Sequence, residues 1–169
     1  MYSVQAQYGY VVVQMLMNHL DENSRKEAQI KASIIDVLSV TVLIAAGGSI
    51  GPSVLEVFNT LLRHLRLSVE NAPSNGPRAH DECNFQEAIV NTVGEFANNL
   101  PDYQKIEIMV SVMGKMHLPS ENSQRNSTEV VLQTMLLKSL LKVATKYKTV
   151  LMSNAFPAAF LEPLLQMTL

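Results

Sequence analysis

The sequence predicts an all-α protein, with residues 1–169 forming one domain of about seven consecutive helices. Two observations predict this class. Apolar residues recur every three or four positions along most of the chain, which is the spacing of one face of a helix. Prolines and glycines gather between the periodic segments, where they end helices and form corners.

Helical periodicity begins near the N-terminus. A first helix is expected over residues 8–20, and the polar turn LDENSRKE follows it. The inward face of this helix is predicted to contain Tyr8, Val12, Met15, Leu16 and His19.

Two apolar helices joined by a glycine-rich corner form the centre of the chain. The first, over residues 30–46, is apolar around most of its circumference, which is typical of a helix buried between neighbours. Its main stripe contains Ile30, Ile34, Val37, Leu38, Val42 and Ala45. Gly47, Gly48, Gly51 and Pro52 end this helix, because glycine and proline interrupt helical backbone.

The second central helix is predicted to start after Ser53, which forms the pattern of a capping box with Glu56. Its apolar stripe contains Val54, Phe58, Leu61, Leu62, Leu65 and Val69. The rest of its surface carries Glu56, Asn59, Thr60, Arg63, His64 and Arg66. The helix is therefore amphipathic and is expected to cover a core.

Four more helices are predicted, with loops near residues 70–83 and 118–127 where polar residues lack helical period. The fourth helix is expected to bury Phe85, Ala88, Ile89, Val93, Phe96 and Leu100. The fifth, over residues 102–116 after the corner at Pro101, is expected to bury Ile106, Met109, Val110, Met113 and Met116. The sixth, capped by Asn126 or Ser127, is expected to bury Leu132, Met135, Leu136, Leu140, Val143 and Tyr147. A short seventh helix begins near Pro157 and carries Phe160, Leu161, Leu164 and Leu165. Methionines on these stripes, including Met15, Met17, Met109, Met113, Met116 and Met135, are interpreted as core fillers.

Charge and cysteine content narrow the class of protein. The chain has 13 basic and 15 acidic residues, so we expect no nucleic-acid partner, which would require a clustered basic field. Its one cysteine, Cys83, cannot form an intramolecular disulfide, and the start MYSVQAQYGY lacks the basic residues of a signal peptide. The longest apolar run contains Asp36 and ends in glycines, so no transmembrane segment is predicted. A cytosol-facing chain is the resulting expectation.

Four blocks of the sequence resemble consecutive parts of the Rolling blackout family, also called the "eighty-five requiring" family. The blocks are VQAQYGYVVVQMLMNHLDENS, IIDVLSVTVLIAAGGSIGPSVLEVFNTLLRHLRLSV, FQEAIVNTVGEFANNLPDYQKIEIM and QTMLLKSLLKV. The stretch GPSVLEVFNTLLRHLRLS is the most specific part. The resemblance implies an armadillo- or HEAT-like helical-repeat solenoid, and alternate helices are spaced near the upper end of that repeat length.

The resemblance also implies a function without catalysis. Members of the family are scaffolds that anchor a phosphatidylinositol 4-kinase complex at the plasma membrane, where they support phosphatidylinositol 4-phosphate synthesis and protein localisation to that membrane. The implied partners are the kinase complex, through its tetratricopeptide-repeat adaptor and hyccin-type subunit, and the inner leaflet. The implied place of a full-length member is the cytoplasmic face of the plasma membrane, while this segment alone is expected in the cytosol.

The family's known contact regions have no match in this sequence. Members attach to the membrane through palmitoylated cysteines and a basic surface near the N-terminus, and contact the adaptor through a C-terminal tail. Here Cys83 lies in an interior loop. We therefore expect an internal segment of a longer solenoid, whose own partner surface is unassigned.

An alternative function is a serine lipase or esterase. Residues Gly47 to Gly51 fit G-x-S-x-G, the nucleophile elbow that would expose Ser49 for attack. His64, His80 and His117 follow it as candidate bases. The required strand before the motif is missing from the pattern, so a glycine-rich helix corner is the preferred interpretation, with no catalytic residue assigned.

Two further clusters are weighed against ordinary surface roles. His80, Asp81, Glu82 and Cys83 are consecutive and have no second pair of ligands, so no metal and no cofactor are predicted. A set of basic residues could attract anionic lipid or an acidic partner, although solvated helix faces carry such residues routinely. The set is Arg63, His64, Arg66, Lys138, Lys142, Lys146 and Lys148.

Overall fold

A computed structural model describes residues 2–45, 54–73, 75–98, 100–116 and 127–145. For residues 2–7 and 42–45 it describes the backbone alone. Within these ranges it contains six helices and no strand, which confirms the predicted all-α class. The helices are α1 Tyr2–Glu22, α2 Ala28–Ala45, α3 Val54–Asn71, α4 Pro77–Asn98, α5 Asp102–Gly114 and α6 Ser127–Ala144. The predicted seventh helix near Pro157 and the capping residue Ser53 lie outside the described residues.

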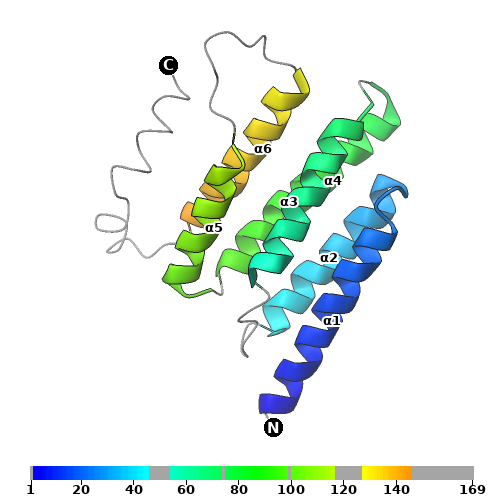
Figure 1. Ribbon diagram of the computed structural model, residues 1–169. Coiled ribbons are helices and arrows are strands. Elements are labelled where there is room, and N and C mark those ends of the chain that lie inside the picture. The colour runs from blue at the N-terminus through cyan, green and yellow to red at the C-terminus, as the bar shows by residue number, and fades with distance from the viewer. Residues whose placement is uncertain (1, 46–53, 74, 99, 117–126, 146–169) are drawn as a thin grey trace, which may run out of the picture.

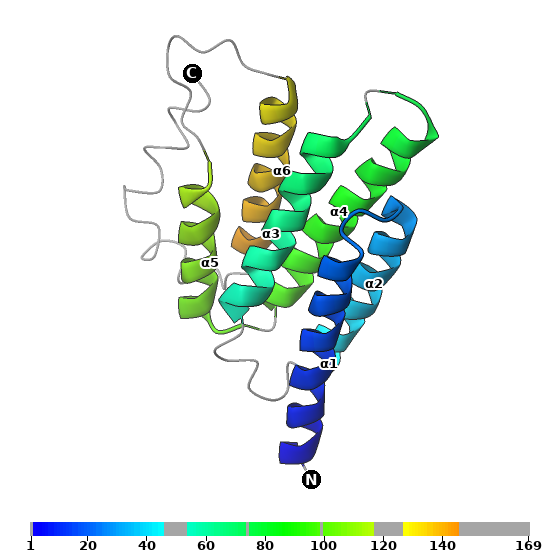
Figure 2. The same cartoon turned by 45° about the vertical axis from the view of Figure 1, so that its right-hand side comes forward.

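The six helices form three antiparallel hairpins that lie side by side in a row (Figure 1). The α1–α2 hairpin makes one end of the row, α3–α4 the middle and α5–α6 the other end. Two layers result, with α1, α3 and α5 in one and α2, α4 and α6 in the other (Figure 2). In the second layer α2 packs on α4 and α4 on α6, and each of these helices also contacts the helix before it. Stacked hairpins of this kind are the architecture of helical-repeat proteins.

The α3–α4 hairpin supplies the centre of the core. The predicted stripe of α3 is confirmed, because all six of its apolar residues are buried. Thr60 and His64, predicted on the polar surface of this helix, are buried as well. Phe58 of α3 meets Phe96 of α4 edge to face, with ring centroids 5.2 Å apart. Phe85, Ile89 and Val93 of α4 are buried as predicted, while Ala88 and Leu100 are only partly buried.

The predicted inward face of α1 is wrong except at Leu16, which is partly buried against the core. Tyr8 and Met15 are 68% and 65% exposed, whereas Val13, Met17 and Leu20 are buried. Apolar residues fill nearly every position from 10 to 17, so the periodicity allowed several faces. Contact with α2 selected the stripe next to the predicted one, and Met15 is not a core filler.

Helix α2 is less buried than its apolar composition predicted. Ile34 and Leu38 are buried as predicted, but Ile30 and Val37 are 45% and 53% exposed. Among the described helices α2 packs mainly on α1 and α4. One side of α2 therefore stays uncovered at the end of the row.

Helix α4 begins at Pro77, inside the loop predicted to run to residue 83. Gly76 has φ 98°, a left-handed conformation that suits glycine, and the helix starts directly after it. Proline is favoured in the first helical turn because its missing N–H would be unsatisfied there. The break is thus confined to the turn between α3 and α4, since nothing after Pro77 opposes a helix.

Helices α5 and α6 follow the prediction in part. In α5 Met109 is buried as predicted, but Val110 is 53% exposed and Lys105 is buried beside Asp102, with Nζ 3.0 Å from its carboxylate. Met113 and Met116 are partly buried against the core. In α6 four of the predicted residues are buried and Leu132 is partly buried, while Asn126 and Tyr147 lie outside the described residues. The four are Met135, Leu136, Leu140 and Val143.

Candidate functional site

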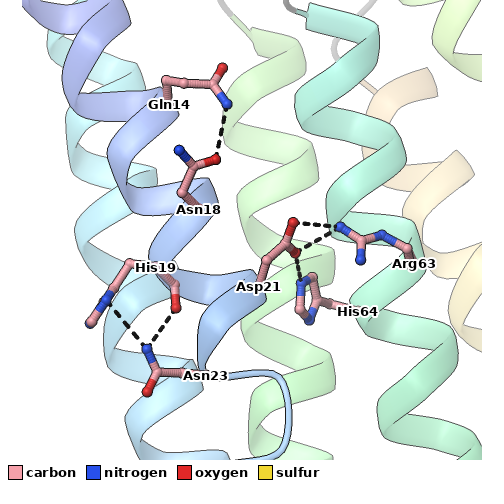
Figure 3. A network of polar contacts seen from close by, with 7 residues as sticks. All are labelled: Gln14, Asn18, His19, Asp21, Asn23, Arg63 and His64. Atoms are coloured by element: carbon pink, nitrogen blue, oxygen red, sulfur yellow. Dashed lines mark hydrogen bonds and ion pairs between the residues drawn. The ribbon is translucent and has the colours of Figure 1, made fainter.

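Asp21, Arg63 and His64 form a cluster where the end of α1 meets α3 (Figure 3). The Asp21 carboxylate accepts hydrogen bonds from Arg63 Nη2 at 2.7 and 2.8 Å and from His64 Nε2 at 2.6 Å. Because an ionised carboxylate only accepts, Nε2 of His64 carries the proton. Asn23 closes the end of α1, since its Nδ2 and its backbone N–H both donate to the His19 carbonyl, at 2.7 and 3.1 Å. The bonds of Asp21 to Arg63 and His64 therefore tie the first hairpin to the second.

The cluster shifts both titrating groups downward. For His64, burial lowers the pKa below its usual value and outweighs the hydrogen bond and charge of Asp21, which act to raise it; the charges of Arg63 and Lys31 lower it further. For Asp21, burial acts to raise the pKa, but the hydrogen bonds and charges of His64 and Arg63 together lower it. The folded protein therefore holds a neutral imidazole against an ionised carboxylate.

This environment does not suit His64 as the base of a hydrolase. The side chain is 2% exposed, and its Nε2 is already bonded to Asp21. A general base must reach the group from which it takes a proton. His80 is exposed on α4, and Ser49 and His117 lie outside the described residues.

A second polar cluster joins α2, α3 and α4. Lys31 is 5% exposed, and its Nζ lies 3.1 Å from Glu82 Oε1 and 4.5 Å from the centre of the Phe85 ring. Ser68 Oγ donates to Glu82 Oε2 at 2.5 Å, and Gln86 Nε2 donates to Ser68 Oγ at 3.1 Å. Every polar group of the cluster thus has a partner, as buried polar groups require.

Sequence reasoning missed this second cluster. Lys31 lies within the apolar helix α2 and Glu82 within a predicted loop, so their spacing along the chain gave no reason to pair them. The usable signal was a single cation on the stripe that continues to Ile34, Ile35 and Leu38. Such a residue is buried only when it finds an acid.

The four residues weighed as a metal cluster and set aside, His80 to Cys83, lie in the first turns of α4. Asp81 accepts a hydrogen bond from Gln29 Nε2 at 3.3 Å, and Glu82 holds Lys31. His80 and Cys83 are exposed. In the described ranges no three ligand-type side chains gather in the manner of a metal site.

The predicted basic residues do not form one surface. Arg63 is paired with Asp21 on α3, and Lys138 lies 3.9 Å from Glu87 on the α4–α6 side. Arg66 is exposed, and Lys146 and Lys148 lie outside the described residues. The structure thus separates Arg63 and His64 from Lys138 and Lys142.

Cavities on the described surface include two that lie between helices or their turns. One, of about 480 Å³, lies between α4 and α6 and is named here the α4–α6 groove. Its lining consists of Glu87, Val90, Asn91, Lys138, Leu141, Lys142 and Thr145. The other, of about 540 Å³, lies between the turns that join α1 to α2 and α3 to α4, and combines Arg25, Lys26 and Arg78 with Glu27, Asp81 and Glu82. No helix in the described ranges is both long and apolar enough to cross a membrane.

The stacked hairpins and the sequence that forms them match a known protein family. A family model described as "EFR3, armadillo repeat" matches residues 1–169. The chain belongs to the EFR3 armadillo-repeat family. This match confirms the family resemblance stated from the sequence. It also confirms the predicted helical-repeat architecture.

EFR3 relatives from distant animals match the whole chain. It is 48% identical over 167 residues to "Protein EFR3 homolog cmp44E" of Drosophila melanogaster, covering 99% of this chain and 19% of the relative. It is 44% identical over 191 residues to "Protein EFR3 homolog B" of Homo sapiens, covering 100% of this chain and 23% of the relative. The chain therefore spans about a fifth of the length of these relatives. No solved structure matches it significantly.

Proposed function

We propose that this chain is part of a non-catalytic scaffold that anchors a phosphatidylinositol 4-kinase complex at the cytoplasmic face of the plasma membrane. In this role it supports phosphatidylinositol 4-phosphate synthesis and the localisation of proteins to that membrane. The observation that carries the proposal is the EFR3 family match along residues 1–169, on a row of stacked hairpins. A helical-repeat stack offers long surfaces of fixed shape, which suit a scaffold.

The side chains of the described residues support a scaffold over an enzyme. His64 is buried and bonded to Asp21, and Asp21 also pairs with Arg63. Lys31 and Glu82 join three helices within the stack. These titratable groups hold helices together, whereas a catalytic group has to face its substrate.

The proposal is tested in cells that lack their own EFR3-family scaffold. A full-length relative is expressed with its matching segment replaced by this chain, and kinase at the plasma membrane and phosphatidylinositol 4-phosphate are measured. We expect the chimera to restore both, and the Ser49→Ala chimera to do so equally. A Leu65→Asp chimera should fail, because it places a charge in the core of α3.

Two results would contradict the proposal. If Ser49→Ala abolishes lipid turnover while the helical content stays unchanged, the serine hydrolase takes its place. If the chimera is folded and present at the membrane but recruits no kinase, the segment does not support the scaffold role. This chain fused to an acylated basic anchor shows whether it recruits the kinase without the rest of the relative.

A further inference from the structure

The α4–α6 groove has an apolar floor and a basic rim. Val90 of α4 is 4% exposed at its base, while Leu141 of α6 is 64% exposed at its edge. A large apolar side chain held in solvent beside a cavity is a common feature of binding surfaces. The groove volume of about 480 Å³ lies in the range of sites that accept several side chains or a small ligand.

The lysines on the rim leave positive charge unmatched. Lys142 makes no ion pair with any residue the structure describes, and Lys138 approaches Glu87 only to 3.9 Å with both side chains about half exposed. A loose pair of exposed charges contributes little to stability. Lys138 can therefore exchange Glu87 for a carboxylate on a ligand.

The position of Lys142 is fixed by the close approach of α6 to α4. A Cβ atom added to Gly94 would lie 3.1 Å from Cβ of Lys142, so the stem of the lysine rests against the α4 backbone. A side chain whose stem is already held loses less conformational entropy on binding. Lys142 is thus prepared to meet an acidic group.

Lys138, Leu141 and Lys142 stand at i, i+3 and i+4 of one helix, so they share a face. We propose that the α4–α6 groove binds an amphipathic helix of a partner protein that carries the mirror pattern, an acidic residue, then an apolar residue and a second acidic residue at i, i+3 and i+4. The apolar side chain enters the groove beside Leu141 and Val90, and the two carboxylates meet Lys138 and Lys142. This is the helix-in-groove mode of recognition, with charge setting the preference. The inference does not depend on the kinase-anchoring role.

The test uses the full 169-residue chain and a fluorescent 16-residue helical peptide that contains Glu-x-x-Leu-Glu. Matched peptides carry Lys in place of both Glu residues, or Ala in place of Leu. Fluorescence anisotropy should show binding of the acidic peptide that weakens with added salt. Binding of the Ala peptide should be weaker by roughly tenfold or more, the loss typical of an anchor residue.

Variants of the chain make the test specific to the groove. Lys138→Glu/Lys142→Glu should abolish binding of the acidic peptide and create binding of the lysine peptide, while Leu141→Ala should weaken both. Lys26→Glu and Leu55→Ala are the matched controls, because they change exposed residues of the same types outside the groove. Circular dichroism verifies that each variant stays folded. If the charge swap leaves peptide preference unchanged, the proposal is wrong.

Lysine acetylation, measured by mass spectrometry, shows whether another part of the chain or a second copy occupies the α4–α6 groove. In the free chain Lys142 should react as readily as Lys26, and the acidic peptide should protect Lys138 and Lys142 but not Lys26. If Lys142 is already protected in the free monomer, residues 146–169 of the same chain fill the groove and the proposal fails. Protection that appears only with a concentration-dependent dimer would assign the groove to a second copy, and would also overturn it.

Discussion

Lys31 places a positive charge, only 5% exposed, between the first two hairpins. Its partners come from the second hairpin, with Glu82 at 3.1 Å and the face of Phe85 at 4.5 Å. Desolvating such a pair is costly, and the attraction repays the cost only when every donor and acceptor is satisfied. Lys31 and Glu82 therefore specify how α2 sits against α4 more than they add to stability.

Removing one member of this pair should be worse than replacing both. We expect Glu82→Ala to lower the free energy of unfolding by about 2 to 3 kcal/mol, because Lys31 and Ser68 lose their acceptor. The double variant Lys31→Met/Glu82→Leu should lie closer to the wild type. Urea denaturation followed by circular dichroism measures both. A double variant at least as unstable as Glu82→Ala would show that the pair stabilises the fold relative to an apolar replacement.

His64 should make the stability depend on pH. Its pKa in the folded state lies below the usual 6.5, so the unfolded chain binds a proton more readily than the folded chain. The stability from the neutral imidazole is present above pH 6.5 and is lost as pH falls through 6.5 toward the folded pKa. Asp21, whose pKa is also lowered, adds a loss only below about pH 3.8.

The measurement is urea denaturation at a series of pH values from about 7.5 to 5, where histidine titrates. His64→Gln is the informative variant, because its amide still donates to Asp21 but does not titrate. We expect a shallower loss of stability with acid in this variant than in the wild type. His80→Gln, at an exposed position, is the control. Equal slopes in all three proteins would show that His64 is not the sensor.

Within the helices, two glycines differ in how closely a neighbouring helix approaches them, while helix propensity disfavours glycine at both. Gly94 of α4 faces Lys142 of α6, with 3.1 Å between an added Cβ and the Lys142 Cβ. Gly114, at the end of α5, has nothing within 4 Å of an added Cβ. Alanine favours a helix over glycine by about 1 kcal/mol in each case, so the difference between the sites reports packing.

Gly114→Ala should therefore stabilise the protein by up to about 1 kcal/mol, with less at a frayed helix end. Gly94→Ala should give no gain or a loss, because the contact meets the stem of Lys142 rather than its flexible end. Thermal denaturation of the two variants and the wild type measures these changes in stability. A clear rise in midpoint for Gly94→Ala would mean that α6 moves freely against α4.

At the scale of the whole molecule, the α1–α2 end of the row leaves apolar surface in solvent. Tyr8, Met15, Val37 and Val40 are each more than half exposed. Several exposed apolar side chains at one end of a helical stack promote association. We expect the 169-residue chain to be helical and to associate as its concentration rises.

Sedimentation velocity over a range of concentrations measures this association. Met15→Lys/Val37→Lys should shift the chain toward monomer without changing its helical content. Asn59→Lys/Asn98→Lys is the matched control, because it changes net charge equally at exposed polar positions. A wild-type chain that stays monomeric at every concentration would contradict the prediction.

The helical class, the approximate place of each described helix and the family all follow from the sequence alone. Its information was sharpest in α3, where the whole predicted apolar stripe is buried, although Thr60 and His64 of the predicted polar surface are buried too. The same logic located Phe85, Ile89, Val93 and Phe96 on α4. Local spacing is sufficient there because an amphipathic helix has one orientation that removes its apolar side from water.

Packing between the hairpins selects which face of α1 turns inward, how far α2 is covered and which charges are buried. Helices that are apolar on most sides have no unique face, so the neighbouring helix selects one. The partners in the pairs Lys31–Glu82 and His64–Asp21 lie 51 and 43 positions apart. Nothing in the sequence around either residue names its partner, because hairpin stacking brings them together. The α4–α6 groove exists for the same reason, since its walls come from two hairpins.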